Sequence, residues 1–387
     1  MRVSANSRYI FLCAAYWTIC TVSNCFNSAY LQEAGYSTFV IGAVTATCGL
    51  LSALLQPILG RICDRNPKVT WRSILRVLIC IHTFLCVIML MVPAKIASLM
   101  IGLLMLLFYL MMPFINESAF IYHANGEYVN FGIARGTGSV VFAGVAYGMG
   151  ILTKQYGCRI VPLIGIPMGA ILFFALTIMP PCTKPAVMQK QTAARRGGIL
   201  SRYPAFSLML LATLLMLCAH TFSGTFLLQI LQSFGGTSKE LGLALAIQAL
   251  MEVPTMMGIT LLLRRFRSST LMLVAACGFL LRTVCFSLAG SLTAVFLCLL
   301  TQAVGYAVYA SVSVYYAAES VDESDRATGQ ALVSSMYTAG SVLGNLLGGT
   351  LYSSFGLRFM LRSGVGLTLV GLVLAVISVS MGRICRK

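Results

Sequence analysis

The sequence is poor in charge. Only 10% of its 387 residues are charged, whereas a soluble globular protein carries about 25%. Apolar runs of about 20 residues recur from end to end, which is the length that a hydrocarbon core roughly 30 Å thick requires. These runs do not alternate between apolar and polar residues, as the short strands of a membrane β-barrel would. The composition therefore excludes a soluble domain and predicts a helical protein that crosses the membrane many times.

The sequence also lacks the usual motifs of catalysis and metal binding. It contains no H-E-x-x-H, no G-x-S-x-G and no C-x-x-C, and its 14 cysteines fall mostly inside the apolar runs. Free cysteine at such positions behaves as a small buried hydrophobe. We expect no structural disulfide, no metal site and no cofactor. A membrane-embedded enzyme is a rival from a different class that no motif supports.

We expect an all-α membrane protein with twelve transmembrane helices in two pseudo-symmetric six-helix bundles. No A-x-A-like cleavage site follows the first apolar run, so we interpret that run as a spanning helix rather than a signal peptide. The predicted spans are approximately 8–31, 38–61, 73–94, 96–122, 129–153, 158–180, 203–231, 238–263, 269–288, 290–316, 327–354 and 358–382. The longest polar interruption predicts three parts: an N-terminal bundle at 1–180, a cytoplasmic linker at 181–202 and a C-terminal bundle at 203–387.

Two pairs of short segments repeat between the halves at nearly the same distance. Residues 35–42 (GYSTFVIG) match 235–242 (GGTSKELG) at an offset of 200, and 150–157 (GILTKQYG) match 349–356 (GTLYSSFG) at an offset of 199. The consistent offset indicates parallel repeats, an architecture typical of transporters that bind substrate near the membrane midplane. Glycines also crowd the fifth and eleventh spans, where small residues let helix backbones approach closely, in static packing or in a sliding contact.

Positive charge is distributed unevenly along the chain. The net charge of +17 would suit nucleic acid, but of the 27 Lys and Arg only six lie on the outer side when both termini are placed in the cytoplasm. Two more lie within spans, and the rest are on the inner side. This is the positive-inside bias, and such loops also attract anionic lipids. The sequence therefore predicts a multi-pass protein of the cell membrane, with membrane lipids and no nucleic acid among its partners.

Four charges lie inside the apolar stretches of the chain rather than near the ends of the predicted spans: Glu117, Arg135, Glu252 and Arg282. A charge at bilayer depth costs at least roughly 2.5–3.5 kcal/mol on insertion scales, so it is kept where it faces a polar cavity or a partner. The first two lie on consecutive antiparallel spans at similar depth in the inner half, and the other two lie near the bilayer centre. These residues are the default candidates for a functional site.

The loop after the second span resembles the G-x-x-x-D-R/K-x-G-R/K signature of the major facilitator superfamily. Gly60, Asp64, Arg65 and Lys68 match it, while Pro67 stands where that family has glycine. The resemblance implies that this loop takes part in conformational change.

A closer resemblance, over nearly the whole chain, is to the lactose permease branch of that superfamily. Residues 55–60 (LQPILG) resemble its F-Q-P-L-F-G, and 131–135 (FGIAR) resemble its F-G-R-A-R. It implies that Glu117 accepts hydrogen bonds from substrate hydroxyls, that Arg135 donates them, and that Phe142 replaces a stacking Trp. The resemblance also aligns Glu252 and Arg282 with an acid and an arginine of the family. For Glu117 and Arg135, the alternative is an ion pair between helices that only aids folding. For Phe142, the alternative is a ring that only packs against its neighbours or faces lipid.

The chain departs from that family at the proton site. Gln302 and Gly305 stand where the family has His and Glu, and His220 replaces one of its acids. Glu252 could still bind the transported proton, with Arg282 as its counter-ion. His220 is a second candidate for the proton site, and the alternative for His220 is a packing role. We count Gln302 among the substrate-binding candidates, because it lies on a helix rich in tyrosine.

The sequence as a whole predicts an alternating-access permease for a small polar organic solute. A sugar or oligosaccharide is the first substrate class, a nucleoside is the second, and import could be coupled to protons. The alternative within the same superfamily is an exporter of drugs or metabolites, which would explain the Met- and Phe-rich interior. We expect a monomer.

Overall fold

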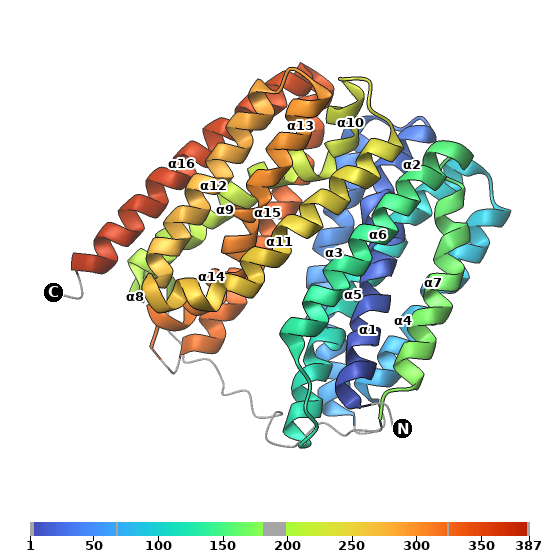
Figure 1. Cartoon of the computed structure of the whole chain (residues 1–387), viewed down its shortest axis with the longest axis horizontal. Coiled ribbons are helices and arrows are strands. Elements are labelled where there is room, and N and C mark those ends of the chain that lie inside the picture. The colour runs from blue at the N-terminus through green and yellow to red at the C-terminus, as the bar shows by residue number, and fades with distance from the viewer. Residues whose placement is uncertain (1–3, 67–68, 181–198, 323–324, 385–387) are drawn as a thin grey trace. The chain divides into compact units, whose positions relative to one another are not determined.

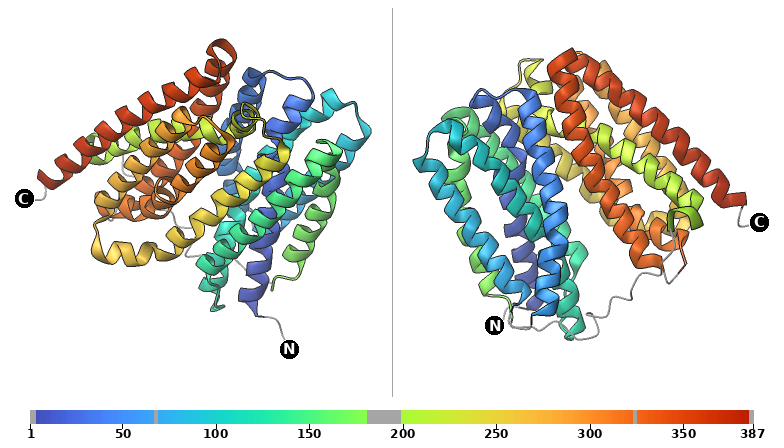
Figure 2. Two further views of the ribbon diagram at one scale, coloured as in Figure 1. Left: turned by 45° about the horizontal axis from the view of Figure 1, so that its top comes forward. Right: turned by 180° about the vertical axis from the view of Figure 1, so that it is seen from behind.

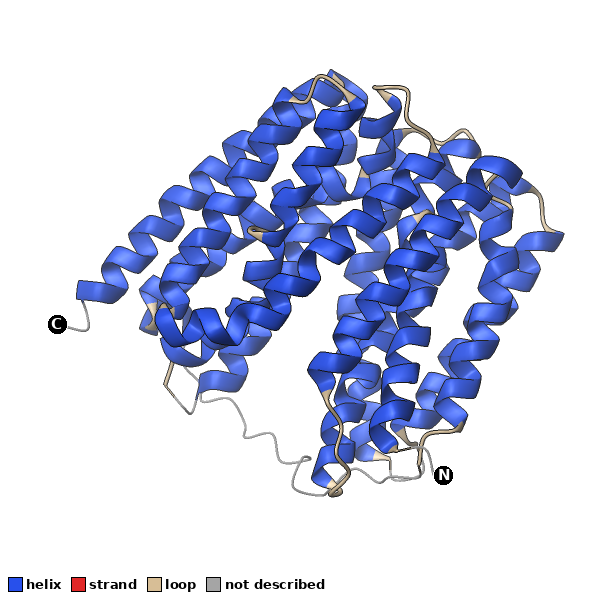
Figure 3. Ribbon diagram, in the orientation of Figure 1, coloured by secondary structure: helices blue, strands red, loops and turns tan. Residues whose placement is uncertain are grey.

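The computed structural model of the protein describes residues 4–66, 69–180, 199–322 and 325–384, without the side chains of residues 64, 65, 260, 327, 383 and 384. Every regular element in these ranges is a helix (Figure 3). The expected all-α fold is confirmed. Of the predicted loop motif, Gly60 is described, but the side chains of Asp64 and Arg65 and the whole of Lys68 lie outside the described residues. Most of the predicted linker at 181–202 lies outside them as well.

Within residues 4–180 and within residues 199–384, the helices follow one another with short connections (Figure 1). Their bounds are α1 (Ala5–Cys20), the π-helical η1 (Thr21–Cys25), α2 (Asn27–Glu33), α3 (Thr38–Arg65), α4 (Trp71–Met91), α5 (Ala94–Ala124), α6 (Phe131–Tyr156), α7 (Ile160–Thr177), α8 (Ile199–Arg202), α9 (Pro204–Thr225), α10 (Leu227–Gln232), α11 (Ser238–Arg265), α12 (Ser268–Leu288), α13 (Leu292–Leu299), the 3-10 turn η3 (Leu300–Ala303), α14 (Tyr306–Ser320), α15 (Arg326–Phe355) and α16 (Leu357–Ile384). Eleven helical segments of the described chain are long and apolar enough to cross a membrane. The 30-residue α15 is a further long helix, at the position of the eleventh predicted span.

Packing contacts divide the chain into two compact units. Unit 1 comprises Met1–Ser37, Thr47–Thr192 and Thr237–Ala249, and unit 2 comprises Thr38–Ala46, Ala193–Gly236 and Leu250–Lys387. The first turns of α3 thus belong to unit 2, and the first half of α11 belongs to unit 1. The predicted boundaries of the two bundles remain a prediction.

Unit 1 is organised around α1, which packs against α5, α6 and α7 (Figure 2). Tyr9 and Tyr16 of α1 are fully buried in its core. Their hydroxyls donate to backbone carbonyls of α5, Tyr9 to Ile115 at 3.3 Å and Tyr16 to Phe108 at 3.1 Å. Because an apolar interior offers no water, a buried hydroxyl must find such a partner. These two bonds fix the rotation of α1 against α5.

A proline inside α5 explains one residue of the 55–60 motif. Pro113 has no backbone N–H, so the carbonyl of Tyr109, four residues earlier, loses its helical donor. Gln56 of α3 supplies the missing bond, with Nε2 donating to the Tyr109 carbonyl at 2.9 Å. Neighbouring side chains commonly satisfy carbonyls freed in this way within membranes. The Gln-Pro pair therefore ties α3 to the proline site of α5.

Unit 2 is organised around α9, which packs against α15 and α16, while α12 packs against α14 and α16. Its core includes Phe206, Phe279 and Val312, each at most 1% exposed. Thr283 of α12 and Thr368 of α16 join their hydroxyls at 2.8 Å in this core. Polar residues of this kind hold membrane helices in one register.

The predicted repeat is visible in the backbone. The first helix of each half breaks at a phenylalanine, Phe26 at φ −102° and ψ 9° and Phe226 at φ −98° and ψ 21°. These two residues are 200 positions apart. Among the described residues, five glycines have positive φ, and four of them form pairs at the predicted offsets, namely Gly35 with Gly235 and Gly157 with Gly356. The two halves therefore share breaks and turns, although few of their residues are identical.

Two close helix contacts also follow the repeat. In unit 2, a Cβ built on Gly42 of α3 would lie 3.2 Å from the Cα of Gly349 of α15. In unit 1, a Cβ built on Gly150 of α6 would lie 2.8 Å from the Cα of Gly242 of α11. Gly42 and Gly242 are equivalent under the first offset, and Gly150 and Gly349 under the second. Of the glycines that crowd the fifth and eleventh spans, Gly150 and Gly349 therefore serve backbone-to-backbone contact, whereas Gly136, Gly144 and Gly148 have no atom near a built Cβ.

Candidate functional site

The most deeply buried charge of the described chain is Arg282, in the middle of α12, with 1% of its surface exposed. Its Nε donates to the hydroxyl of Ser223 on α9 at 3.2 Å, and its guanidinium lies over the ring of Phe286 at 4.9 Å. Nη1 and Nη2 have no hydrogen-bond partner among the described residues. An arginine so far from water with two free donors is costly for stability. This cost marks Arg282 as a functional candidate.

Glu252 and Gln302 meet in the same unit. Gln302 donates its Nε2 to Glu252 Oε1 at 2.8 Å, and its own Oε1 has no partner among the described residues. One turn later on α11, Thr255 donates to the carbonyl of Ala303 at 3.0 Å. The short 3-10 turn η3 presents both of these groups to α11. Glu252 also lies close enough to Arg282 to interact with it electrostatically, so the two predicted charges belong to one cluster.

Aromatic rings line this cluster. His220 of α9 stacks on Tyr306 of α14, with ring centroids 5.1 Å apart and an angle of 4° between the planes, and meets Phe279 edge-on at 5.5 Å. Tyr306 in turn contacts Tyr337 of α15 at 6.4 Å. Nδ1 of His220 has no partner among the described residues. Unit 2 therefore combines an arginine, a carboxylate, an amide, an imidazole and flat ring faces.

Unit 1 contains a smaller cluster around Arg135 of α6. Its guanidinium lies over the ring of Trp17 of α1, 3.7 Å from the ring centroid, and Nη1 has no hydrogen-bond partner in the described chain. Gly138, one turn further along α6, leaves the space for this indole, because a Cβ there would lie 2.7 Å from Trp17 Cδ1. Tyr16 and Phe108 pack edge-on against the indole and hold it in place.

The first helix is wound more loosely beside this cluster. The π-helical segment Thr21–Cys25 carries Asn24, whose side-chain oxygen accepts a hydrogen bond from the Tyr109 hydroxyl at 3.1 Å. Such π segments are frequent at functional sites, since they redirect side chains that a regular helix would turn away. Asn24 and Tyr109 thus extend the polar surface of unit 1.

The other two predicted residues of unit 1, Glu117 and Phe142, are half-buried. Glu117 lies two turns before the end of α5, while Arg135 lies one turn after the start of α6. Phe142 packs against Ala143 of its own helix and against Ala246 and Ala249 of α11. The aromatic ring that contacts the Arg135 guanidinium in the structure is that of Trp17. The substrate-binding roles of Glu117 and Phe142 remain predictions.

Sequence analysis missed Trp17, Asn24, Tyr109 and Gln248. Gln248 lies one turn before Glu252 on the same face of α11, and its Nε2 has no partner among the described residues. One feature of the sequence could have found Trp17. It is one of only two tryptophans in the chain, and it lies well inside a span rather than at the membrane interface, where tryptophan is usual.

Comparisons with known proteins agree with this architecture. A model of the MFS_1 like family matches residues 9–363. The solved structure of the nucleoside transporter NupG is similar over 98% of this chain and 99% of its own, with a TM-score of 0.78 at 15% identity. A point mutant of the peptide transporter POT is similar over 97% of this chain and 95% of its own, with a TM-score of 0.73 at 13% identity.

A bacterial homolog of the human lysosomal transporter Spinster is similar over 97% of this chain and 94% of its own, with a TM-score of 0.63 at 16% identity. No curated protein sequence matches the chain. At such low identities the solved structures establish the fold alone, whereas the family match extends over most of the chain. The chain belongs to the MFS_1 like family and is a multi-pass membrane transporter of the major facilitator type, not an enzyme.

Proposed function

We propose that this secondary transporter of small solutes carries nucleosides, with sugars as the second candidate substrates, by alternating access between its two repeats. The main observation behind this proposal is the set of buried groups without hydrogen-bond partners beside aromatic faces. Donors are the Nη atoms of Arg282 and Nη1 of Arg135, and an acceptor is Oε1 of Gln302. A nucleoside offers ribose hydroxyls, base carbonyls and ring nitrogens to such groups, and a flat base to the rings.

In unit 2, the carboxylate of Glu252 would accept hydrogen bonds from ribose hydroxyls, and Arg282 and Gln302 would contact the polar edge of the base. The stack of His220 on Tyr306 supports this assignment, because it offers a broad planar surface beside the cluster. In unit 1, Arg135 on Trp17 would donate to a carbonyl or hydroxyl, with Glu117 as acceptor. Charged groups make the hydrogen bonds that orient a substrate most strongly.

Sugars stay in the proposal because the embedded acids and arginines suit hydroxyl-rich solutes as well. The exporter reading has weaker support, since a promiscuous drug site is usually flexible and apolar, whereas this cluster is polar. We further propose import coupled to protons, with Glu252 as the proton carrier, because Gln302, its partner, cannot titrate. The proposed location is the cell membrane, with both termini cytoplasmic and the chain acting as a monomer.

Uptake by purified protein in liposomes tests the substrate class. Radiolabelled uridine, adenosine, glucose and lactose are offered separately, with and without an inwardly directed proton gradient. We expect uptake of the nucleosides, inhibition by unlabelled nucleosides, and no uptake into liposomes without protein. Uptake of the sugars alone would reject the nucleoside assignment and leave the sugar candidate. Extrusion of ethidium without uptake of either class would reject both in favour of an exporter.

A further inference from the structure

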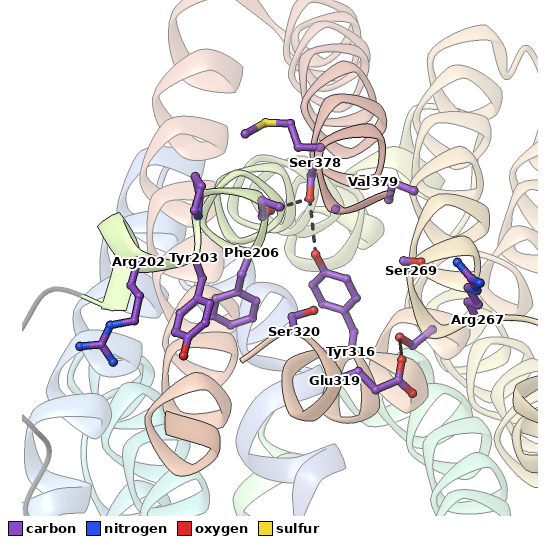
Figure 4. Close-up of a pocket in the computed structure, with 15 residues that line it drawn as sticks. Arg202, Tyr203, Phe206, Arg267, Ser269, Tyr316, Glu319, Ser320, Ser378 and Val379 are labelled. Carbon is purple, nitrogen blue, oxygen red and sulfur yellow. Dashed lines mark hydrogen bonds between the residues drawn. The ribbon is translucent and has the colours of Figure 1, made fainter. Parts of the chain in front are cut away.

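A separate pocket lies at the ends of four helices in unit 2. It has a volume of about 240 Å³ and forms where α9 and α12 begin and where α14 and α16 end. Figure 4 shows Tyr203 and Phe206 on one side of it, Ser269 and Arg267 on the other, and Tyr316 between them. Ser268 of this pocket precedes Arg282 by 14 residues, which is about 21 Å along α12. The pocket is therefore distinct from the candidate transport site.

Most polar groups in its walls are already paired. Arg202 donates to Asp325 at 2.7 Å, and the Tyr203 hydroxyl donates to Asp322 at 2.7 Å. The bond to Asp322 raises the pKa of Tyr203, so this hydroxyl stays uncharged. Ser378 pairs with the Tyr316 hydroxyl at 3.4 Å, drawn as a dashed line in Figure 4. These bonds connect helix ends and give the pocket a fixed shape.

Other groups in the lining remain available to a ligand. The side chains of Arg267, Ser269 and Ser320 make no hydrogen bond to another described residue, and Arg267 is exposed. Helix α12 begins directly after Arg267 and has no side-chain cap on its first amides. An arginine, free hydroxyls and the uncapped positive end of a 21-residue helix together form a set of donors suited to phosphate oxygens.

The rest of the lining is apolar. Phe206 and Val379 are buried beside the pocket, and Met381 of α16 completes this side. A site for a free phosphate ion has no need of an apolar wall, whereas a lipid phosphate carries hydrocarbon with it. The position at the helix ends also suits a headgroup. We infer that this pocket binds the phosphate of an anionic phospholipid, with Arg267, Ser269 and the first amides of α12 as donors.

The acid in the lining narrows the choice of lipid. Glu319 accepts a hydrogen bond from the Ser268 hydroxyl at 2.5 Å and lies at the edge of the same pocket. Its negative charge opposes a second negative charge on the ligand. A phosphodiester with one charge, such as phosphatidylglycerol, therefore fits this lining better than a phosphomonoester with nearly two. Attraction by the neighbouring Arg264 and Arg265 adds to binding without selecting the headgroup.

Lipid binding to the purified full-length protein tests this inference without reference to any transported solute. Retention of dioleoyl-phosphatidylglycerol is titrated by native mass spectrometry against dioleoyl-phosphatidylcholine as the neutral lipid. We expect Arg267→Gln to weaken phosphatidylglycerol binding about fivefold, the effect of one basic contact at a membrane surface. Ser269→Ala should weaken it by a smaller factor. Arg265→Gln is the matched control. It removes the same charge only two residues from Arg267, but the Arg265 side chain does not line the pocket.

Three results would overturn the inference. Equal losses in Arg267→Gln and Arg265→Gln, with unchanged melting temperatures for both, would show diffuse attraction instead of a site. Equal binding of the two lipids by the unaltered protein would exclude recognition of an anionic headgroup. Displacement of the lipid by millimolar glycerol 3-phosphate would make a soluble phosphate ester the ligand. Each of these results leaves the proposed nucleoside transport untouched.

Discussion

At the scale of single residues, the contact of Arg135 with Trp17 gives a prediction that separates two aromatic candidates. The indole holds the guanidinium at 3.7 Å from its ring centroid, and such contacts are worth about 0.5–2 kcal/mol. Trp17→Leu should therefore lower the apparent affinity for substrate by a factor of about 2–30. Phe142→Leu should change it less, because Phe142 packs against the apolar core of unit 1 and against alanines of α6 and α11, and leucine keeps most of that packing. Substrate binding is measured by scintillation proximity with the purified variants.

The conservative variant Trp17→Phe serves as the control, since it keeps an aromatic face of smaller area. It should retain more affinity than Trp17→Leu while melting at a similar temperature. A larger loss in Phe142→Leu than in Trp17→Leu would favour Phe142, the residue that sequence comparison selected, as the stacking partner.

Arg282 and Glu252 give a second prediction at this scale. If the two charges compensate each other, removing either one leaves the other uncompensated in an apolar region, which typically costs about 3–5 kcal/mol for a buried pair. Arg282→Gln should thus lower the melting temperature in detergent strongly. The double variant Arg282→Gln with Glu252→Gln should recover part of that loss, giving a coupling energy of about 0.5–3 kcal/mol. Strictly additive losses would show that the two side chains act independently.

The residues of the site were predictable to different degrees. Glu252, Arg282 and Arg135 could be found because a charge inside an apolar run is rare and conspicuous. Trp17 could not be found as easily, since an aromatic residue in a span has the same hydropathy whether it faces lipid or an arginine. Gln248 was missed for a related reason. It is a candidate because its side-chain amide has no hydrogen-bond partner among the described residues, and hydrogen-bond partners cannot be identified from the sequence alone.

At the scale of helices, the close approach of α6 and α11 predicts a strong effect of one methyl group. A Cβ on Gly242 would lie 2.8 Å from the Cα of Gly150, too close for any side-chain movement to relieve. Gly242→Ala should therefore cost about 1–3 kcal/mol, as overpacking does elsewhere, and should reduce uptake. Gly148→Ala on α6 is the matched control, because a Cβ there meets no atom within 4 Å. Melting temperature and uptake rate are measured for both.

Gly150→Ala extends this test, because a Cβ on Gly150 of α6 would meet the backbone of α11 at Gly242 in the same contact. It should resemble Gly242→Ala in both measurements. Equal behaviour of Gly242→Ala and Gly148→Ala would mean that the two helices separate readily at this point.

Helix positions were predictable from hydropathy, but irregularities within helices were not. The predicted span at 8–31 corresponds to α1, η1 and α2, and its apolar character gives no indication of the π-helical segment Thr21–Cys25. The bond from Gln56 to the Tyr109 carbonyl shows a similar limit. Sequence comparison recognised the Gln-Pro motif, whereas its structural role depends on a proline in another helix.

For the whole molecule, the internal repeat is the feature that the sequence predicted best. The offsets of 200 and 199 reappear in the breaks at Phe26 and Phe226 and in the paired positive-φ glycines. Backbone turns of this kind persist because only glycine adopts positive φ without strain. The charges follow the repeat less closely, since Arg135 of unit 1 lies over Trp17 of another helix, whereas Arg282 of unit 2 lies over Phe286 of its own helix.

Proton coupling is a property of the whole transport cycle, and it gives the last prediction. Glu252 is the carboxylate of the unit 2 cluster, and its recorded partner Gln302 cannot release a proton. If Glu252 carries the proton, Glu252→Gln should mimic its protonated form. Such a variant should still exchange substrate across liposome membranes, because exchange needs no net proton movement. It should no longer accumulate substrate against a gradient when the outside is made acidic.

The magnitude of the loss can be estimated. One cotransported proton supplies about 2.3 kcal/mol per 100 mV of membrane potential, which corresponds to a concentration ratio of about 50 at equilibrium. Glu252→Gln should reduce that ratio to unity while internal pH stays constant during uptake. Loss of exchange together with accumulation would assign Glu252 to substrate binding alone. Retained accumulation in the variant would exclude Glu252 as the carrier and direct attention to His220, another titratable side chain that the structure places beside Arg282.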